Sequence, residues 1–213
     1  MGTANVRCQI QRFLELGGFM VDLRLARTRF PRIVKINYCL SAILFVVLLT
    51  GCDGNTELMK YSMSGDVESV RGLLDSGVDV NQRNNYGWSA LSHAARTGET
   101  EIARLLLEKG ADANGQDDRG WTPLMRAASK GHNDTVALLL EQGAKVDVVD
   151  NDGWTALLWA VNREYPDVVT TLIKHGANVN VIARDGRTPL LVASSEGYQE
   201  IVQLLQQAGA KYQ

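Results

Sequence analysis

A 33-residue period is the feature of this sequence that most constrains its fold. Four segments align without gaps, and they start at residues 85, 118, 151 and 184. A series of glycines marks the period at Gly87, Gly120, Gly153 and Gly186. A unit of this size is too small to bury its own apolar face, so neighbouring units must stack. The period therefore predicts a repeat array whose stability is a sum over neighbouring units.

Within each unit, the sequence predicts a tight turn followed by two antiparallel helices. The glycine of the series suits a turn that needs a positive φ. A hydroxyl residue two positions later suits a helix N-cap, at Ser89, Thr122, Thr155 and Thr188. In the second unit, Pro123 follows at the first helical position, where its missing N–H is harmless. Leu124 and Ala127 lie on the apolar face of that helix, and Gly143 is predicted to end the next one as its C-cap.

The second unit reads "DRGWTPLMRAASKGHNDTVALLLEQGAKVD" over residues 118–147. Its "G-x-T-P-L-x-x-A-A" and "L-L-x-x-G-A" patterns, repeated at this period, resemble the ankyrin repeat. The resemblance covers residues 55–213. It implies an all-α repeat solenoid, an ankyrin array of helix pairs with β-hairpin fingers.

Two departures from the repeat pattern are visible in the last two units. Glu164 stands where the other units have glycine between their two helices. We expect Pro166 to begin the second helix of that unit and the loop before it to be reshaped. In the final unit, Gln206 replaces a leucine or isoleucine, as suits an outer face with no further neighbour.

An export signal is predicted ahead of the repeats. The uncharged stretch 36–50 follows a basic segment, and its apolar centre, "CLSAILFVVLL", is shorter than the roughly 20 residues of a membrane-spanning helix. It ends in "LTGC" (49–52), which resembles the lipobox of bacterial lipoproteins. That resemblance implies cleavage before Cys52 and lipidation of this cysteine, whose acyl chains would hold the chain at a membrane. The alternative is an uncleaved membrane anchor over residues 33–49, which Lys35 and Asn37 disfavour.

The predicted organisation follows from these two resemblances. Its parts are a basic leader and lipoprotein signal peptide (1–51), a lipidated cysteine with a short linker (52–54), an N-terminal capping half repeat (55–81), ankyrin repeats at 82–114, 115–147 and 148–180, and a C-terminal ankyrin repeat at 181–213. By similarity to enterobacterial lipoproteins, Asp53 favours retention in the inner membrane. We therefore expect a lipid-anchored envelope protein on the periplasmic face of that membrane.

Charge divides the chain at the same place. Residues 1–51 carry a net charge of +5, whereas residues 52–213 carry −7. An acidic body disfavours binding to nucleic acid. All three cysteines lie at or before residue 52, so the repeats offer neither a disulfide framework nor a thiolate metal site.

The repeats show no pattern that predicts catalysis. Asp150 and Asp152 have the spacing of a calcium loop, but Val148 and Trp159 occupy its first and last ligand positions. Nucleotide-binding, serine-hydrolase and zinc-protease motifs are missing from the sequence. We therefore expect no enzyme activity, no cofactor and no bound metal.

The ankyrin resemblance implies that fingers and first helices form a concave face that binds another protein. The predicted binding residues are Tyr86, Trp88, Arg96, Arg119, Trp121, Arg126, Lys130, Trp154, Trp159, Arg163 and Arg187. Aromatic residues and arginine dominate interface hot spots. The alternative is that the tryptophans pack across neighbouring fingers and support the stack. If they bind a partner, Trp121→Ala or Arg126→Ala should weaken binding and leave thermal stability nearly unchanged.

The most specific functional hypothesis is a membrane-anchored protein-binding module, either a scaffold or an inhibitor. Small exported ankyrin lipoproteins include immunity proteins, and the resemblance implies that this chain neutralises a secreted toxic effector such as a phospholipase. A second hypothesis is an envelope factor that assists an exported enzyme or a stress response. A third is a cytoplasmic ankyrin regulator whose leader is misread.

Overall fold

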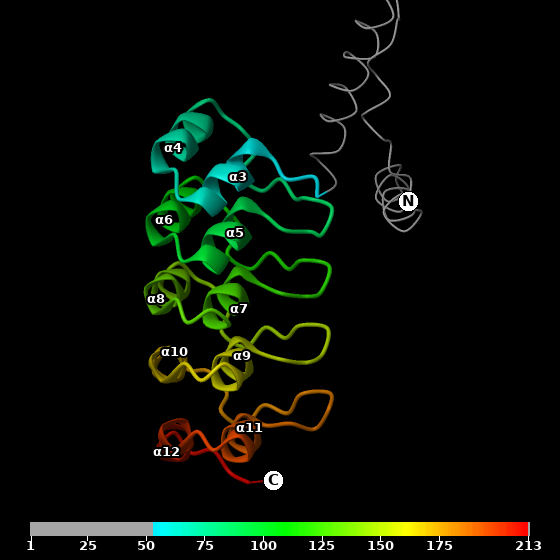
Figure 1. The fold of residues 1–213 in the computed structure, drawn as a ribbon, viewed down its shortest axis with the longest axis vertical. Coiled ribbons are helices and arrows are strands. Elements are labelled where there is room, and N and C mark those ends of the chain that lie inside the picture. The colour runs from blue at the N-terminus through cyan, green and yellow to red at the C-terminus, as the bar shows by residue number, and fades with distance from the viewer. Residues whose placement is uncertain (1–52, 213) are drawn as a thin grey trace, which may run out of the picture. The chain divides into compact units, whose positions relative to one another are not determined.

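A computed structural model of the protein describes residues 53–212. Cys52 and the rest of the lipobox lie outside the described residues. Within 53–212 the chain forms ten helices (Figure 1). They are α3 (Glu57–Ser64), α4 (Val67–Asp75), α5 (Ala90–Thr97), α6 (Thr100–Glu108), α7 (Pro123–Ala128), α8 (Asn133–Glu141), α9 (Ala156–Asn162), α10 (Pro166–Lys174), α11 (Pro189–Glu196) and α12 (Gln199–Gln207).

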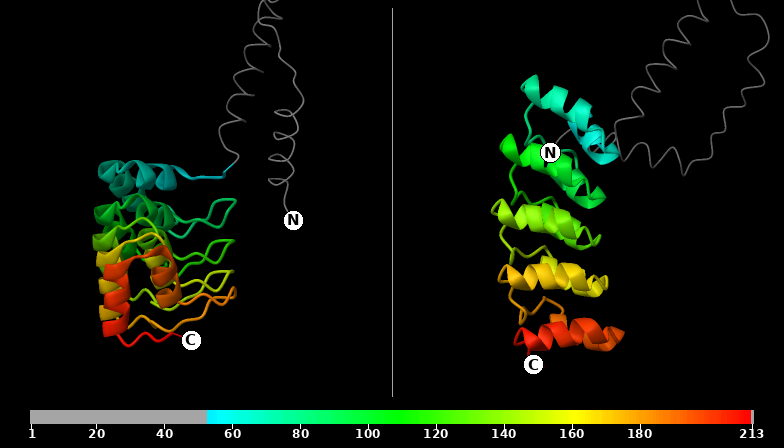
Figure 2. Two further views of the ribbon diagram at one scale, coloured as in Figure 1. Left: turned by 60° about the horizontal axis from the view of Figure 1, so that its bottom comes forward. Right: turned by 90° about the vertical axis from the view of Figure 1, so that its left-hand side faces the viewer.

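The helices stack in two parallel columns. The inner column is α3, α5, α7, α9 and α11, and the outer column is α4, α6, α8, α10 and α12, with each helix contacting the next one in its column (Figure 1). A loop of about the same shape projects from the inner column between successive pairs, as Figure 1 and the left view of Figure 2 show. We call these loops the fingers; they comprise residues 82–88, 115–121, 148–154 and 181–187. The surface that the fingers share with the inner helices is called the inner face below.

A continuous apolar core runs through both columns. Each full repeat has a leucine at the same position of its inner helix, and each of these leucines is at most 1% exposed. They are Leu91, Leu124, Leu157 and Leu190. Three residues after each of these leucines is a fully buried alanine, for example Ala94 and Ala127. The small side chain lets adjacent helices approach closely, so neighbouring units pack tightly against each other.

The predicted helix starts are confirmed. Ser89, Thr122, Thr155 and Thr188 have extended backbones, and each hydroxyl accepts a hydrogen bond from the N–H three residues later. Pro123 occupies the first turn of α7, as expected. The predicted C-cap needs a correction, because Gln142 caps α8 and Gly143 is the next residue, with φ +85°.

The prediction that the loop at Glu164 would be reshaped is wrong. Glu164 adopts φ +58°, close to the values of the glycines Gly98, Gly131 and Gly197 (+77° to +81°) at the same position. The N–H of Tyr165 donates to the carbonyl of Ala160 (3.0 Å), as the N–H of His132 does to Ala127 in the preceding unit. The chain therefore keeps the turn and holds a glutamate in a left-handed conformation that L-residues disfavour. Pro166 begins α10, as predicted.

The fingers contain fewer backbone hydrogen bonds than a hairpin ladder. Inside each finger, an N–H donates to a carbonyl four residues on, as from Asp117 to Trp121 (3.0 Å). Between fingers, Asp118 donates to Tyr86 (3.2 Å) and Asn151 donates to Arg119 (3.0 Å). No β-strand occurs in the part of the chain that the structure describes, so the predicted β-hairpins are not confirmed.

Candidate functional site

Each of the first three fingers is fixed by one buried or half-buried side chain at its base. The Oδ1 atom of Asp117 accepts hydrogen bonds from the backbone N–H groups of Arg119 (2.8 Å) and Trp121 (3.0 Å). Asn84 and Asp150 accept from the two equivalent N–H groups of their own fingers. Such side-chain turns hold a short loop in one conformation. As a result, the tryptophan that ends each of these fingers has a defined position.

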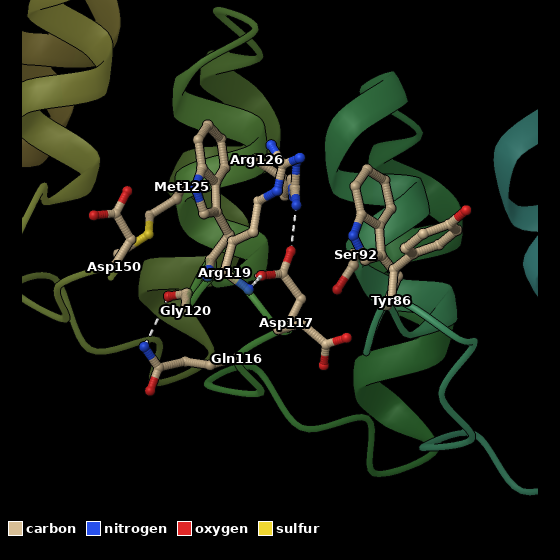
Figure 3. Close-up of polar contacts among 12 residues, drawn as sticks. Tyr86, Ser92, Gln116, Asp117, Arg119, Gly120, Met125, Arg126 and Asp150 are labelled. Carbon is tan, nitrogen blue, oxygen red and sulfur yellow. Dashed lines mark hydrogen bonds and ion pairs between the residues drawn. The ribbon is translucent and has the colours of Figure 1, made fainter. Parts of the chain in front are cut away.

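The second carboxylate oxygen of each aspartate connects the finger to the inner helix. The Oδ2 atom of Asp117 forms an ion pair with Arg126 on α7, and its carboxylate is 1% exposed (Figure 3). The Oδ2 atom of Asp150 accepts a hydrogen bond from the indole Nε1 of Trp159 on α9 (2.9 Å). In both repeats the donor lies nine residues after the aspartate. The same device therefore orients a guanidinium in one repeat and an indole in the next.

These side chains pack into a ladder that crosses the inner face. The guanidinium of Arg126 lies between two indoles, 3.8 Å from the ring centroid of Trp88 and 4.4 Å from that of Trp121. Trp121 then contacts Trp159 (4.4 Å between centroids), and Trp159 contacts Trp154 (4.7 Å). The ladder ends where Arg187 stacks on Trp154 (4.6 Å). We call these six residues the Trp–Arg ladder.

The charge of Arg126 is set by several groups around it. Burial is the main cause that lowers the pKa of Arg126, and the nearby guanidinium groups of Arg96 and Arg119 lower this pKa further. The ion pair with Asp117 acts in the opposite direction and raises the pKa of Arg126. Arginine keeps its proton at neutral pH in proteins, so Arg126 stays charged next to two other cations and one carboxylate.

The structure divides the eleven predicted binding residues into two groups. Six form the Trp–Arg ladder: Trp88, Trp121, Arg126, Trp154, Trp159 and Arg187. The other five are exposed on the inner face: Tyr86, Arg96, Arg119, Lys130 and Arg163. Trp154 is only 5% exposed, so little of it is available to a partner.

The expectation that Arg126→Ala or Trp121→Ala would leave stability unchanged does not fit this geometry. Both side chains are packed between neighbouring repeats, and Arg126 also compensates the buried charge of Asp117. Their removal would break contacts between units, which is where a repeat array obtains its stability. The ladder thus fits the alternative that the tryptophans support the stack, whereas the five exposed residues stay candidates for direct binding.

Sequence reasoning missed Asp117 and Asp150 as organisers of this face. The pattern that could have revealed them is an asparagine or aspartate three residues before the finger glycine, which recurs at Asn84, Asp117 and Asp150. The recurrence ends at Ala183, whose repeat has Val192 instead of a donor on the inner helix. In that finger, Asp185 accepts from the N–H and the Nε of Arg187 instead, and these bonds lower the pKa of Asp185.

No group of three or more histidine, cysteine, aspartate or glutamate residues is placed to hold a metal ion within residues 53–212. The helices described here include none long and apolar enough to cross a membrane.

Paired helices stacked in register with a finger at each step define a helical repeat solenoid. The family model for ankyrin repeats (three copies) matches residues 58–150 and 142–213, which is more than half of the chain. The chain therefore belongs to the ankyrin-repeat family. Ankyrin repeats are protein–protein interaction modules and are generally non-enzymatic scaffolds, and no catalytic family was identified. A search of curated proteins found no match to the sequence.

Proposed function

We propose that the inner face of this array binds another protein and that a lipid on Cys52 holds the complex at a membrane. The observation that supports binding is the position of five exposed residues, Tyr86, Arg96, Arg119, Lys130 and Arg163, beside a ladder that is already packed. A rigid, preorganised face loses little conformational entropy on binding.

The membrane tether rests on the resemblance of residues 49–52 to a lipobox. Helix α3 begins at Glu57, five residues beyond Cys52, so a lipid there would place the array next to the bilayer surface. Two or three acyl chains give stable attachment, whereas a single chain gives marginal binding. We propose the periplasmic face of the inner membrane as the location.

Within this function, we propose an immunity role in which the array neutralises a secreted toxic effector such as a phospholipase. A tethered inhibitor would lie beside the lipid that a phospholipase attacks. The effective concentration of such an inhibitor at the membrane would be raised by the tether. Deletion of the gene should then make cells more sensitive to toxin-bearing siblings, and unchanged sensitivity would exclude the immunity role.

Site-specific photo-crosslinking tests the binding face in cells that make the full chain. A photoreactive residue at Tyr86, which is 53% exposed in its finger, should form a cross-link to a protein. The same residue at Arg104, exposed on outer helix α6, is the matched control and should give much less product. Equal yields at both positions, or no protein cross-link at Tyr86, would contradict the proposal.

Mass spectrometry of the mature protein tests the tether separately. We expect an N-terminus at Cys52 that carries acyl chains. The variant Cys52→Ser should move the protein from the membrane fraction and leave the fold of residues 53–212 intact. A mature chain that retains residues 36–51 would contradict the lipoprotein proposal without affecting the binding face.

A further inference from the structure

Charge is segregated between the two helix columns of this array. In the three central repeats, the inner-helix segments 90–97, 123–130 and 156–163 contain four cations and no carboxylate. The outer helices of the same three repeats, α6, α8 and α10, contain five carboxylates and two cations. In these three repeats, the basic side of an otherwise acidic body is thus the inner face, along its helices.

Four exposed cations on this face have no carboxylate of their own. They are Arg96, Arg119, Lys130 and Arg163, and we call them the basic patch. On the inner face, Arg126 and Arg187 form the ion pairs found within residues 53–212. None of the four members of the basic patch forms an ion pair in this part of the chain. The finger tips add exposed carboxylates at Asp118 and Asp152, so the excess of positive charge lies toward the helices.

Two guanidinium groups converge at one end of the patch. The Cζ of Arg96 lies 5.6 Å from the ring centroid of Trp88, and the Cζ of Arg126 lies 3.8 Å from the same ring. The one carboxylate beside them, Asp117, is buried and already accepts from two N–H groups and from Arg126. Two guanidinium groups that share one carboxylate keep an excess of positive charge, which favours the approach of an anion.

We propose, on the basis of the protein-binding function above, that the partner presents an acidic protein segment to the basic patch. The chemistry recognised is the carboxylate group of aspartate or glutamate, which arginine binds through paired N–H donors. Lys130 and Arg163 occupy the same position in consecutive repeats, so they suit successive carboxylates along one segment. An extended polyanion such as nucleic acid or an anionic bilayer is disfavoured, because residues 52–213 carry a net charge of −7.

A defined peptide tests the patch with the detergent-solubilised full chain. The probe is a fluorescein-labelled 16-residue peptide of alternating glutamate and serine, and its control has glutamine in place of glutamate. Fluorescence anisotropy should show binding of the glutamate peptide that is at least tenfold tighter than that of the control. Its affinity should fall as salt rises, because exposed charge pairs are screened.

Matched triple variants locate the binding. Arg96→Gln, Lys130→Gln and Arg163→Gln together should weaken binding of the glutamate peptide at least tenfold. Arg71→Gln, Arg104→Gln and Lys174→Gln together remove the same charge from the outer helices and should change the affinity less than twofold. Circular dichroism should show that both triples keep the wild-type helix content, since all six side chains are exposed.

Several results would overturn this inference. These are no binding of the glutamate peptide at 1 mM, equal losses in the two triples, or tighter patch-dependent binding of phosphatidylglycerol vesicles or a 20-nucleotide DNA. The cross-linking experiment at Tyr86 separates this inference from the proposed function. If the triple variant of Arg96, Lys130 and Arg163 gives the same protein cross-link as the wild type, the acidic partner is refuted and protein binding is retained. If no protein cross-link forms at all, protein binding itself is refuted.

Discussion

Removing the guanidinium of Arg126 should destabilise the array because Asp117 would then be buried without a countercharge. In the substitution Arg126→Met, the side chain keeps its apolar bulk, and the carboxylate of Asp117 keeps its two backbone donors. What is lost is the ion pair and the cation–π contact with two indoles, Trp88 and Trp121. The effect should therefore appear as a loss of folding free energy.

The magnitude follows from the exposure of the pair. Breaking a fully buried ion pair costs about 3–5 kcal/mol, and each desolvated cation–π contact contributes up to about 2 kcal/mol. The side chain of Arg126 is 12% exposed, so water reaches one edge of the site and reduces this cost. A methionine also makes sulfur–aromatic contacts that recover about 1 kcal/mol. We expect a net loss of about 3 kcal/mol, or a fall in melting temperature of roughly 6–12 °C.

A double-mutant cycle isolates the pair from these packing effects. The variant Asp117→Asn keeps the Oδ1 acceptor, and Asn84 shows that an amide can hold the same turn in this chain. Combined with Arg126→Met, it removes both charges, so most of the lost stability should return. Urea denaturation of the four proteins should give a coupling energy of about 2 kcal/mol. A coupling below about 0.5 kcal/mol would show that the ion pair does not stabilise the ladder.

Three further substitutions should raise the free energy of unfolding measured by urea denaturation. Glu164→Gly removes the left-handed glutamate (φ +58°) and should stabilise the fold by about 1 kcal/mol. The control is Gly131→Ala at the same position of the preceding repeat. It should destabilise the fold, because the added Cβ would lie 2.7 Å from the ring of Tyr165. Ser62→Ala should gain about 1 kcal/mol, because the Ser62 hydroxyl is buried without a hydrogen-bond partner among the residues described. Asp147→Asn should add about 1 kcal/mol by donating to the carbonyl of Gly176, as Asn114 donates to Gly143 (3.3 Å). A loss of stability in any of these three variants would refute the reason given for it.

The repeat, its helix starts and the glycine turns of its fingers could be predicted from the sequence because they depend on neighbouring residues. A hydroxyl N-cap such as Thr122 bonds to an N–H three residues away, and a finger glycine adopts its φ whatever lies elsewhere in the chain. The eleven predicted binding residues do share the inner face, because the 33-residue period brings equivalent positions together. The sequence could also suggest that the tryptophans stack, as one of two alternatives.

The interleaved order of the ladder could not be predicted from the pattern. Arg126 lies between Trp88 of one repeat and Trp121 of its own because Asp117 holds its guanidinium there, and that carboxylate belongs to a finger nine residues earlier. Glu164 was misjudged for a different reason. Propensity disfavours a left-handed glutamate, but hydrogen bonds and packing shared with the other repeats retain the turn.

Hydrogen–deuterium exchange of the chain, alone and with the partner that cross-linking identifies, tests the central claim most directly. Binding through the inner face should slow exchange in the fingers at residues 82–88, 115–121 and 148–154 and in inner helices α5, α7 and α9. Exchange in outer helices α6, α8 and α10 should change little. Protection that is confined to the outer helices, or none at all, would contradict the account of this array as a module that binds a protein through its fingers and inner helices.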